Sequence, residues 1–179
     1  AQVTGAGAVH VYDLAGWPLG SVANPAPAAG DRFGASLALV GSGTVAVGAP
    51  GDDPAGVADA GSVFLFDDAG TLLSSLVDPA AAAGDRFGSR LCSLDGLLVV
   101  GAPGGGGSGT NAGAVYIYAG DGTLLAQIPN PDPEATVGFG SSLAALGNGL
   151  FAVGAVSAPS AGLPRWVQYS VFDTNGVLV

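Results

Sequence analysis

The sequence predicts an all-β protein, a β-propeller-like array of four-stranded antiparallel blades. A block that opens with Phe-Gly and closes with Gly-Ala-Pro covers residues 30–50, returns at 84–103, and returns in weaker form at 138–156. Corresponding glycines of successive blocks, such as Gly48 and Gly101, are about 53 residues apart. The apolar stretches between turn signals are short, and none has the period of a helix. Four short strands in a repeat of about 50 residues are typical of a propeller blade.

The middle copy shows the four strands most clearly. Its first two strands are expected at 89–94 and 97–101, joined by Asp95-Gly96, a two-residue signal for a type I′ hairpin. The third is expected at 114–118 and the fourth at 123–128, with a glycine-containing turn between them. Each stretch has the usual length of a strand.

The other copies repeat this pattern. Third strands are expected at 8–12, 62–66 and 169–172, and the hairpins at 41–43 and 147–149 replace Asp-Gly. The first two strands of a copy are small and apolar on both faces, which predicts burial in the crowded inner part of a blade. The aromatic residues of the third strand are expected to lie between blades.

One propeller segment therefore covers residues 1–179. It divides into a half blade at 1–30 and blades at 31–83, 84–136 and 137–179. This makes fourteen expected strands, or about three and a half blades, whereas propellers close with about four to eight. The chain is thus expected to be an excerpt of a longer propeller or a subunit that joins further copies of itself, because unpaired strand edges invite association.

The repeat is carried by fourteen structural positions: Asp31, Arg32, Phe33, Gly34, Gly48, Pro50, Asp85, Arg86, Phe87, Gly88, Gly101, Pro103, Phe139 and Gly140. These residues resemble the FG-GAP repeat family, and in particular its bacterial extracellular form. The third copy departs from the pattern, with Val156 in place of the proline. The resemblance implies a β-propeller like the head of integrin α subunits, and a role in adhesion or ligand binding.

Charge and composition exclude several classes of partner. The chain has no lysine, and its four arginines oppose 14 acidic residues for a net charge of −10. Nucleic acids and anionic membrane surfaces need clustered cations, so neither is an expected partner. No apolar run approaches the ~20 residues of a membrane span. The start Ala1-Gln2 resembles a chain after signal cleavage, and an extracellular or cell-surface location is expected.

Three carboxylates, Asp52, Asp53 and Asp59, share one loop after the first Gly-Ala-Pro. They are candidates for binding a ligand or a divalent ion, although a solvated acidic loop explains them as well. The integrin-type calcium loop is absent, because two-residue turns stand where it would lie, so no cofactor is expected and calcium stays only a possibility. Trp17 and Trp166 break the repeat and are candidate contact residues, with packing as the alternative.

The Asp-Arg pairs at 31–32 and 85–86 have two interpretations. Their arginines could bind a carboxylate at a blade junction, or each pair could be structural, with the aspartate capping a turn and the arginine bridging to the neighbouring blade. Val137-Gly138 replaces the pair in the third copy, which predicts a looser junction. His10 aligns with Phe64 and Tyr116 and is expected to pack between blades.

The leading functional hypothesis is a non-enzymatic extracellular or cell-surface module that binds a protein or a carbohydrate through the loops after Gly-Ala-Pro, at 51–60, 104–112 and 157–164. The first alternative is a structural subunit that assembles through its blade edges into a ring or filament. The second is a propeller-based hydrolase or lyase. It is disfavoured because one histidine and no lysine leave few groups for acid–base catalysis.

Overall fold

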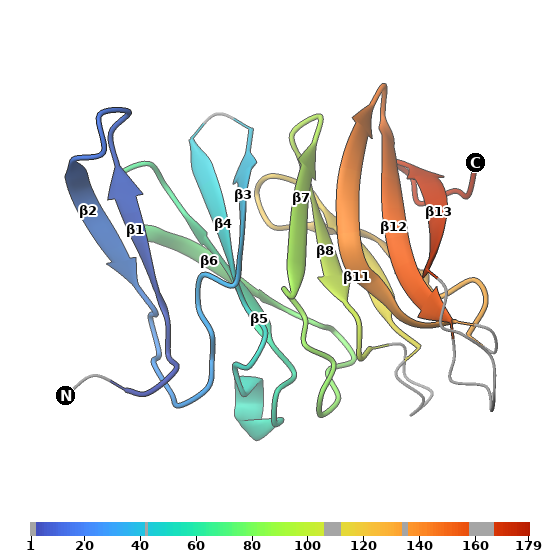
Figure 1. Cartoon of the computed structure of the whole chain (residues 1–179), viewed down its shortest axis with the longest axis horizontal. Helices are drawn as coiled ribbons and strands as arrows, with labels where there is room; N and C mark the ends of the chain where they lie inside the picture. The colour runs from blue at the N-terminus through green and yellow to red at the C-terminus, as the bar shows by residue number, and fades with distance from the viewer. Residues whose placement is uncertain (1–2, 42, 106–111, 134–135, 158–166) are drawn as a thin grey trace.

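The structure is a computed structural model that describes residues 3–41, 43–105, 112–133, 136–157 and 167–179. In these ranges it contains thirteen β-strands, one 3₁₀ turn (η1, Pro54–Gly56) and no α-helix, so the all-β prediction is confirmed. Figure 1 shows the strands gathered into sheets that stand side by side in chain order, from the N-terminus at the left to the C-terminus at the right. This is a propeller-like array of blades.

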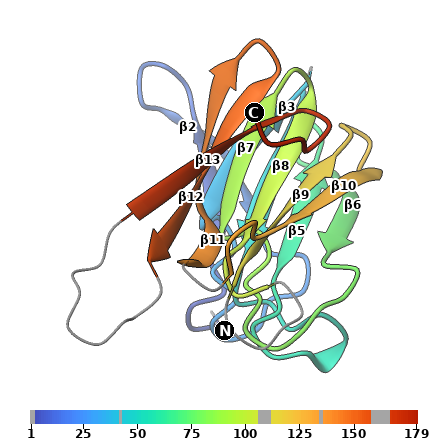
Figure 2. The same cartoon turned by 90° about the vertical axis from the view of Figure 1, so that its right-hand side faces the viewer.

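Four antiparallel sheets make up the described part of the chain, and in each the neighbours in sequence are neighbours in space. The strands are β1 (Ala8–Tyr12), β2 (Pro18–Ala23), β3 (Ser36–Val40), β4 (Thr44–Ala49), β5 (Ser62–Phe66), β6 (Leu72–Val77), β7 (Arg90–Leu94), β8 (Leu97–Ala102), β9 (Ala114–Tyr118), β10 (Leu124–Pro129), β11 (Thr136–Gly147), β12 (Leu150–Ser157) and β13 (Val167–Asp173). The first sheet is β1-β2, the second β3-β4-β5-β6, the third β7-β8-β9-β10 and the fourth β11-β12-β13. Seen from the side, the strands of successive sheets overlap as a twisted stack (Figure 2).

The two-residue hairpin expected at Asp95-Gly96 is confirmed. Asp95 has φ 52° and Gly96 has φ 81°, the positive values that a type I′ turn requires. The turn sets the register of β7 on β8, which pairs Leu94 with Leu97 and Arg90 with Gly101. The same register pairs Ser36 with Gly48 in the second sheet.

Aromatic rings fill the space between neighbouring sheets. Phe87 is fully buried, with its ring centroid 5.3 Å from that of Tyr116 and 6.1 Å from that of Tyr118. These rings pack on aliphatic side chains of the second sheet, including Val63 and Leu65, in one buried cluster. The other two junctions are built in the same way, with Phe33 against Phe64 and Phe66, and Phe139 against Phe172. Burying rings of this size is the main source of stability in such an array.

Backbone contacts also tie each sheet to the next. The N–H of Phe87 donates to the carbonyl of Ala60 at 2.8 Å, and Phe33 and Phe139 make the corresponding bonds to the preceding sheet. The approach is so close that a Cβ on Gly61 would lie 2.2 Å from the carbonyl oxygen of Phe87. Glycine is therefore required at this position, which we call the seat glycine. Gly7 and Gly113 occupy it in the first and third sheets.

The fourth sheet differs from the prediction, because the sequence led us to expect fourteen strands and four of them here. Among the described residues this sheet has three strands. Leu178 makes only a single bridge to Phe172, and the N–H of Val179 donates to the carbonyl of Val171 at 2.9 Å. By register with the Gly-Ala-Pro segments, Val167 stands at the seat position of this sheet, and it is 76% exposed.

The expected burial of the inner strands is wrong for β3. Leu37 and Leu39 are 51% and 61% exposed, whereas Leu91, at the position of Leu37 in the next sheet, packs against a buried cluster. The cause lies in the first sheet. It has two strands, matching the outer half of a blade, so the described chain puts no inner strands over these two leucines.

Candidate functional site

The acidic loop after β4 is stabilised by hydrogen bonds within the loop. The N–H of Asp59 donates to Oδ1 of Asp53 at 2.7 Å, and the N–H of Gly61 donates to the carbonyl of Asp52 at 2.9 Å. Pro54 begins η1 between them. Asp53 and Asp59 are exposed and Asp52 is half-buried. The loop thus presents carboxylates on an ordered support.

A divalent ion site was a candidate here, but the structure does not bring these three carboxylates together as ligands. Within the described ranges no group of three or more His, Cys, Asp or Glu side chains could hold a metal ion. Oδ1 of Asp53 is already engaged by the N–H of Asp59. The carboxylates of Asp53 and Asp59 are exposed at the surface of the loop.

The two ends of the sheets carry different connections. We call the end with the acidic loop and the Phe-Gly segments the loop face; it lies at the bottom of Figure 1. We call the end with the tight β-hairpins, such as the one at Asp95-Gly96, the hairpin face; it lies at the top of Figure 1. Trp17 lies in the β1-β2 turn on the hairpin face, and its side chain is 72% exposed. Its backbone N–H donates to Oδ1 of Asp13 at 2.8 Å. It is therefore remote from the acidic loop. Trp166 lies outside the described residues, as do most of the loops after the second and third Gly-Ala segments.

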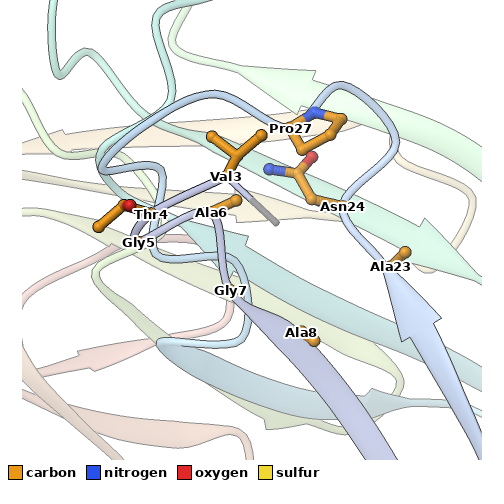
Figure 3. A pocket seen from close by; sticks show the side chains of 9 residues that line it. All are labelled: Val3, Thr4, Gly5, Ala6, Gly7, Ala8, Ala23, Asn24 and Pro27. Carbon is orange, nitrogen blue, oxygen red and sulfur yellow. The ribbon is translucent and has the colours of Figure 1, made fainter. Parts of the chain in front are cut away.

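A cavity of about 660 Å³ lies beside β1 at the loop-face end of the first sheet (Figure 3). Its walls include Val3, Asn24 and Pro27 together with the segment from Gly5 to Ala8. In the second sheet the residues equivalent to Gly7 and Ala8 face the Gly-Ala-Pro turn, where Ser62 pairs with Ala49 and Gly61 bonds to Asp52. The cavity is therefore the space that a Gly-Ala-Pro turn fills in a complete blade.

In each Asp-Arg pair the aspartate makes its hydrogen bonds through the side chain and the arginine through the backbone. Oδ2 of Asp31 accepts from Nδ2 of Asn24 at 2.7 Å and from the N–H of Ala28 at 2.6 Å, and Asp85 accepts from the N–H of Ala82 at 2.6 Å. Both aspartates are buried and cap the turns that precede Phe-Gly.

The arginines reach the preceding sheet through their backbones. The N–H of Arg32 donates to the carbonyl of Gly5 at 2.9 Å, and that of Arg86 to the carbonyl of Asp59 at 3.0 Å. Their guanidinium groups are exposed, so the expected bridge is made by the main chain rather than by the side chain. In the third copy, where Val137-Gly138 replaces the pair, β11 begins already at Thr136 and Phe139 is still only 1% exposed.

Comparison with known families fits this geometry. The FG-GAP repeat matches residues 25–66 and 71–118, which together make up half of the chain. The chain belongs to the FG-GAP repeat family. The matches cover β3 to β5 and β6 to β9, with their Phe-Gly and Gly-Ala-Pro segments. No curated protein matches the chain.

FG-GAP repeats form β-propeller modules that are generally non-enzymatic and typically extracellular. In the part of the chain that the structure describes, no helix is long and apolar enough to cross a membrane.

One polar group in this FG-GAP array was missed by sequence reasoning. The hydroxyl of Tyr116 donates to Oδ2 of Asp78 at 2.5 Å, and Asp78 and Asp85 are each 4% exposed. Burial and the neighbouring charge of Asp78 raise the pKa of the Asp85 carboxyl above its usual range. A signal was available in the repeat: Asp78 and Tyr116, at the junction of the second and third sheets, stand where the junction of the first and second sheets has Asn24 and Phe64.

His10 does not pack as expected. It is exposed on β1, and it pairs with Ser21 as Phe64 pairs with Ser75. The ring that packs on Phe64 is Phe33, from the Phe-Gly segment of the same blade. The first sheet contains only the outer strands, so no such ring covers His10 in the described chain.

Proposed function

We propose that this FG-GAP array is a non-enzymatic extracellular or cell-surface module that binds a protein or a carbohydrate through its loop face. The observation that carries the proposal is the acidic loop at 51–61, an ordered and exposed structure on a repeated scaffold. A scaffold of this kind keeps its loops in place while their sequences vary, and binding residues are concentrated on such loops.

Two further features support binding rather than catalysis. Asp53 and Asp59 are exposed, so they are available to a partner without rearrangement of the fold. Acid–base catalysis needs convergent groups of different pKa, and the one histidine lies on β1, away from the acidic loop. No cofactor is part of the proposal.

The test is binding of the purified chain to arrays of extracellular proteins and of glycans. The triple variant Asp52→Asn/Asp53→Asn/Asp59→Asn is expected to lose about tenfold or more in affinity for the ligand found. The charge-matched control changes three exposed hairpin-face residues, Asp68, Asp95 and Asp121, to Asn and is expected to bind normally. Equal loss in both triples, or no binding of either ligand class by the wild type, would refute the proposal. Protease treatment of intact producing cells tests the location.

Self-association is the second candidate, and the surface beside the first sheet favours it. The free edge of β1 carries no charged residue and no proline, the usual devices that protect an edge strand. Leu37 and Leu39 are exposed next to it, on the inner strand of the second sheet. We propose that a second copy of the chain covers this surface.

Light scattering coupled to size-exclusion chromatography tests the second candidate. Leu39→Glu is expected to convert a dimer or larger assembly into a monomer. Leu125→Glu, at a similarly exposed leucine on the outer strand β10, is the control and is expected to leave the assembly unchanged. A wild-type chain that is monomeric at high concentration would exclude this candidate and leave the binding proposal intact.

A further inference from the structure

Three of the chain's four arginines line one small pocket. Its volume is about 240 Å³, and its lining residues are Arg32, Ala35, Pro50, Arg86, Ser89, Arg90, Pro103 and Ser141. Ala35, Ser89 and Ser141 each directly follow a Phe-Gly pair. The pocket thus lies on the loop face, where the Phe-Gly segments of three successive blades meet.

The positive charge of this pocket is not neutralised by its neighbours. Asp31 and Asp85 precede two of its arginines in sequence, but their side chains are buried. Their carboxylate oxygens accept hydrogen bonds from N–H groups of the preceding turns. No acidic side chain among the described residues lines the pocket. Three cations gathered in a hollow of a protein with net charge −10 make a local site for an anion.

The fold does not require arginine at two of these positions. Arg32 and Arg86 have φ 58° and 56°, the left-handed region that favours glycine. The third copy has Gly138 at the equivalent position, with φ 65°, and Phe139 still packs there. The bonds to the preceding sheet use only the backbone N–H, which any residue but proline supplies. Two strained arginines where glycine suffices indicate a role for the guanidinium groups.

We propose that this pocket binds an oxyanion: the carboxylate, sulfate or phosphate group of a small ligand. A guanidinium group presents a planar fork of N–H donors that matches two oxygens of such a group. Arg90 donates from Nη1 to the carbonyl of Ser89, another lining residue, at 2.7 Å, and its guanidinium group has further N–H donors for a ligand.

The ligand is a compact anion rather than a polyanion. A volume of about 240 Å³ holds one anionic group with a single small ring. A long polyanion would meet repulsion from the acidic surface beyond the pocket, since the chain outside these arginines is strongly negative. The arginine pocket does not include residues of the acidic loop, so anion binding here is tested separately from the function proposed above.

Titration calorimetry of the full chain with sodium sulfate, sodium phosphate and glucuronate, at constant ionic strength, tests the site. Saturable binding is expected for the wild type. Arg86→Gly and Arg32→Gly are each expected to weaken it about tenfold or more, with an unchanged or higher melting temperature, because glycine relieves the left-handed strain. Arg86→Lys keeps the charge but not the fork, and is expected to weaken binding less than Arg86→Gly.

Gly138→Arg provides the converse test, because it adds an arginine at the equivalent position of the third copy. A Cβ there would have no atom closer than the carbonyl oxygen of Pro103 at 4.0 Å, so the side chain has room. Binding is expected to tighten several-fold. Tighter binding of glucuronate or a sugar sulfate than of the inorganic ions would identify carbohydrate as the source of the anionic group, and the reverse order would identify a free ion.

Two results would overturn the proposal. One is a wild-type chain that binds none of these anions. The other is an Arg86→Gly variant that binds as the wild type does, or that loses stability and so shows a purely structural arginine. Neither result bears on the loop-face binding measured with the aspartate variants.

Discussion

The pairing of Tyr116 with Asp78 yields a quantitative prediction, because the repeat contains its own control. At the junction of the first and second sheets the same two positions hold Asn24 and Phe64, with neither a hydroxyl nor a second carboxylate. There Nδ2 of Asn24 donates to Oδ2 of Asp31 at 2.7 Å. The double variant Asp78→Asn/Tyr116→Phe therefore rebuilds in the second junction an arrangement that the first junction already contains.

The single variant Tyr116→Phe removes the donor to Oδ2 of Asp78 and leaves that buried oxygen without its 2.5 Å hydrogen bond. We expect it to lower the free energy of unfolding by about 1.5–3 kcal/mol, the usual cost of a lost hydrogen bond to a charged group. The double variant should recover most of this. An asparagine at 78 needs no phenolic donor, can still accept from the N–H of Ala80, and can donate toward Asp85.

Urea denaturation followed by far-ultraviolet circular dichroism, on the wild type, both single variants and the double variant, measures the coupling. We expect a coupling free energy of about 1.5–3 kcal/mol, since the two side chains act as one unit. Purely additive effects, or a double variant less stable than Tyr116→Phe alone, would refute this account of the junction.

Three further predictions concern the same junction. Because the pKa of Asp85 is raised in the folded state, its contribution to stability is full below its unfolded value of 3.8 and is lost as pH rises through the raised folded value. The free energy of unfolding should therefore fall over that range in the wild type, and fall less in Asp78→Asn; identical pH profiles would contradict the charge coupling. Phe87→Ala should cost about 3–5 kcal/mol in urea unfolding, while Trp17→Ala, at an exposed turn, should cost under about 0.5 kcal/mol. Gly61→Ala should cost more than about 3 kcal/mol, because it adds a clash to the strain of a positive φ, whereas Gly96→Ala, with open space around it, should cost about 1 kcal/mol by thermal or urea melting; similar losses in both would contradict the close approach.

The blade pattern could be predicted from sequence because it repeats. The motifs Phe-Gly and Gly-Ala-Pro and the two-residue hairpins, such as Asp95-Gly96, occur at fixed spacing. Each indicates a specific local backbone conformation. Repetition turns several weak signals into one strong signal. The all-β architecture and the FG-GAP family were accessible for this reason.

The site was less accessible, because it depends on which repeats are adjacent. Sequence reasoning gave the acidic loop and Trp17 as separate candidates without placing them relative to each other, and strand direction puts them at opposite ends of the sheets. It also expected Leu37 and Leu39 to be buried, a prediction that assumed a complete blade beside them. The arginine pocket combines residues from three repeats, and Arg90 stands where the other copies have serine, so no single motif shows it.

Val167 makes the seat position of the fourth sheet different from that of the other sheets. Every other described sheet offers a bare main chain on which the following Phe-Gly segment rests, but the fourth presents a branched side chain at that point. A further sheet placed against β13 could not dock in the manner of its predecessors and would need a different joint. The two flanks of the described array therefore differ: the flank at β13 has a valine at the seat position, and the flank at β1 has an exposed strand edge.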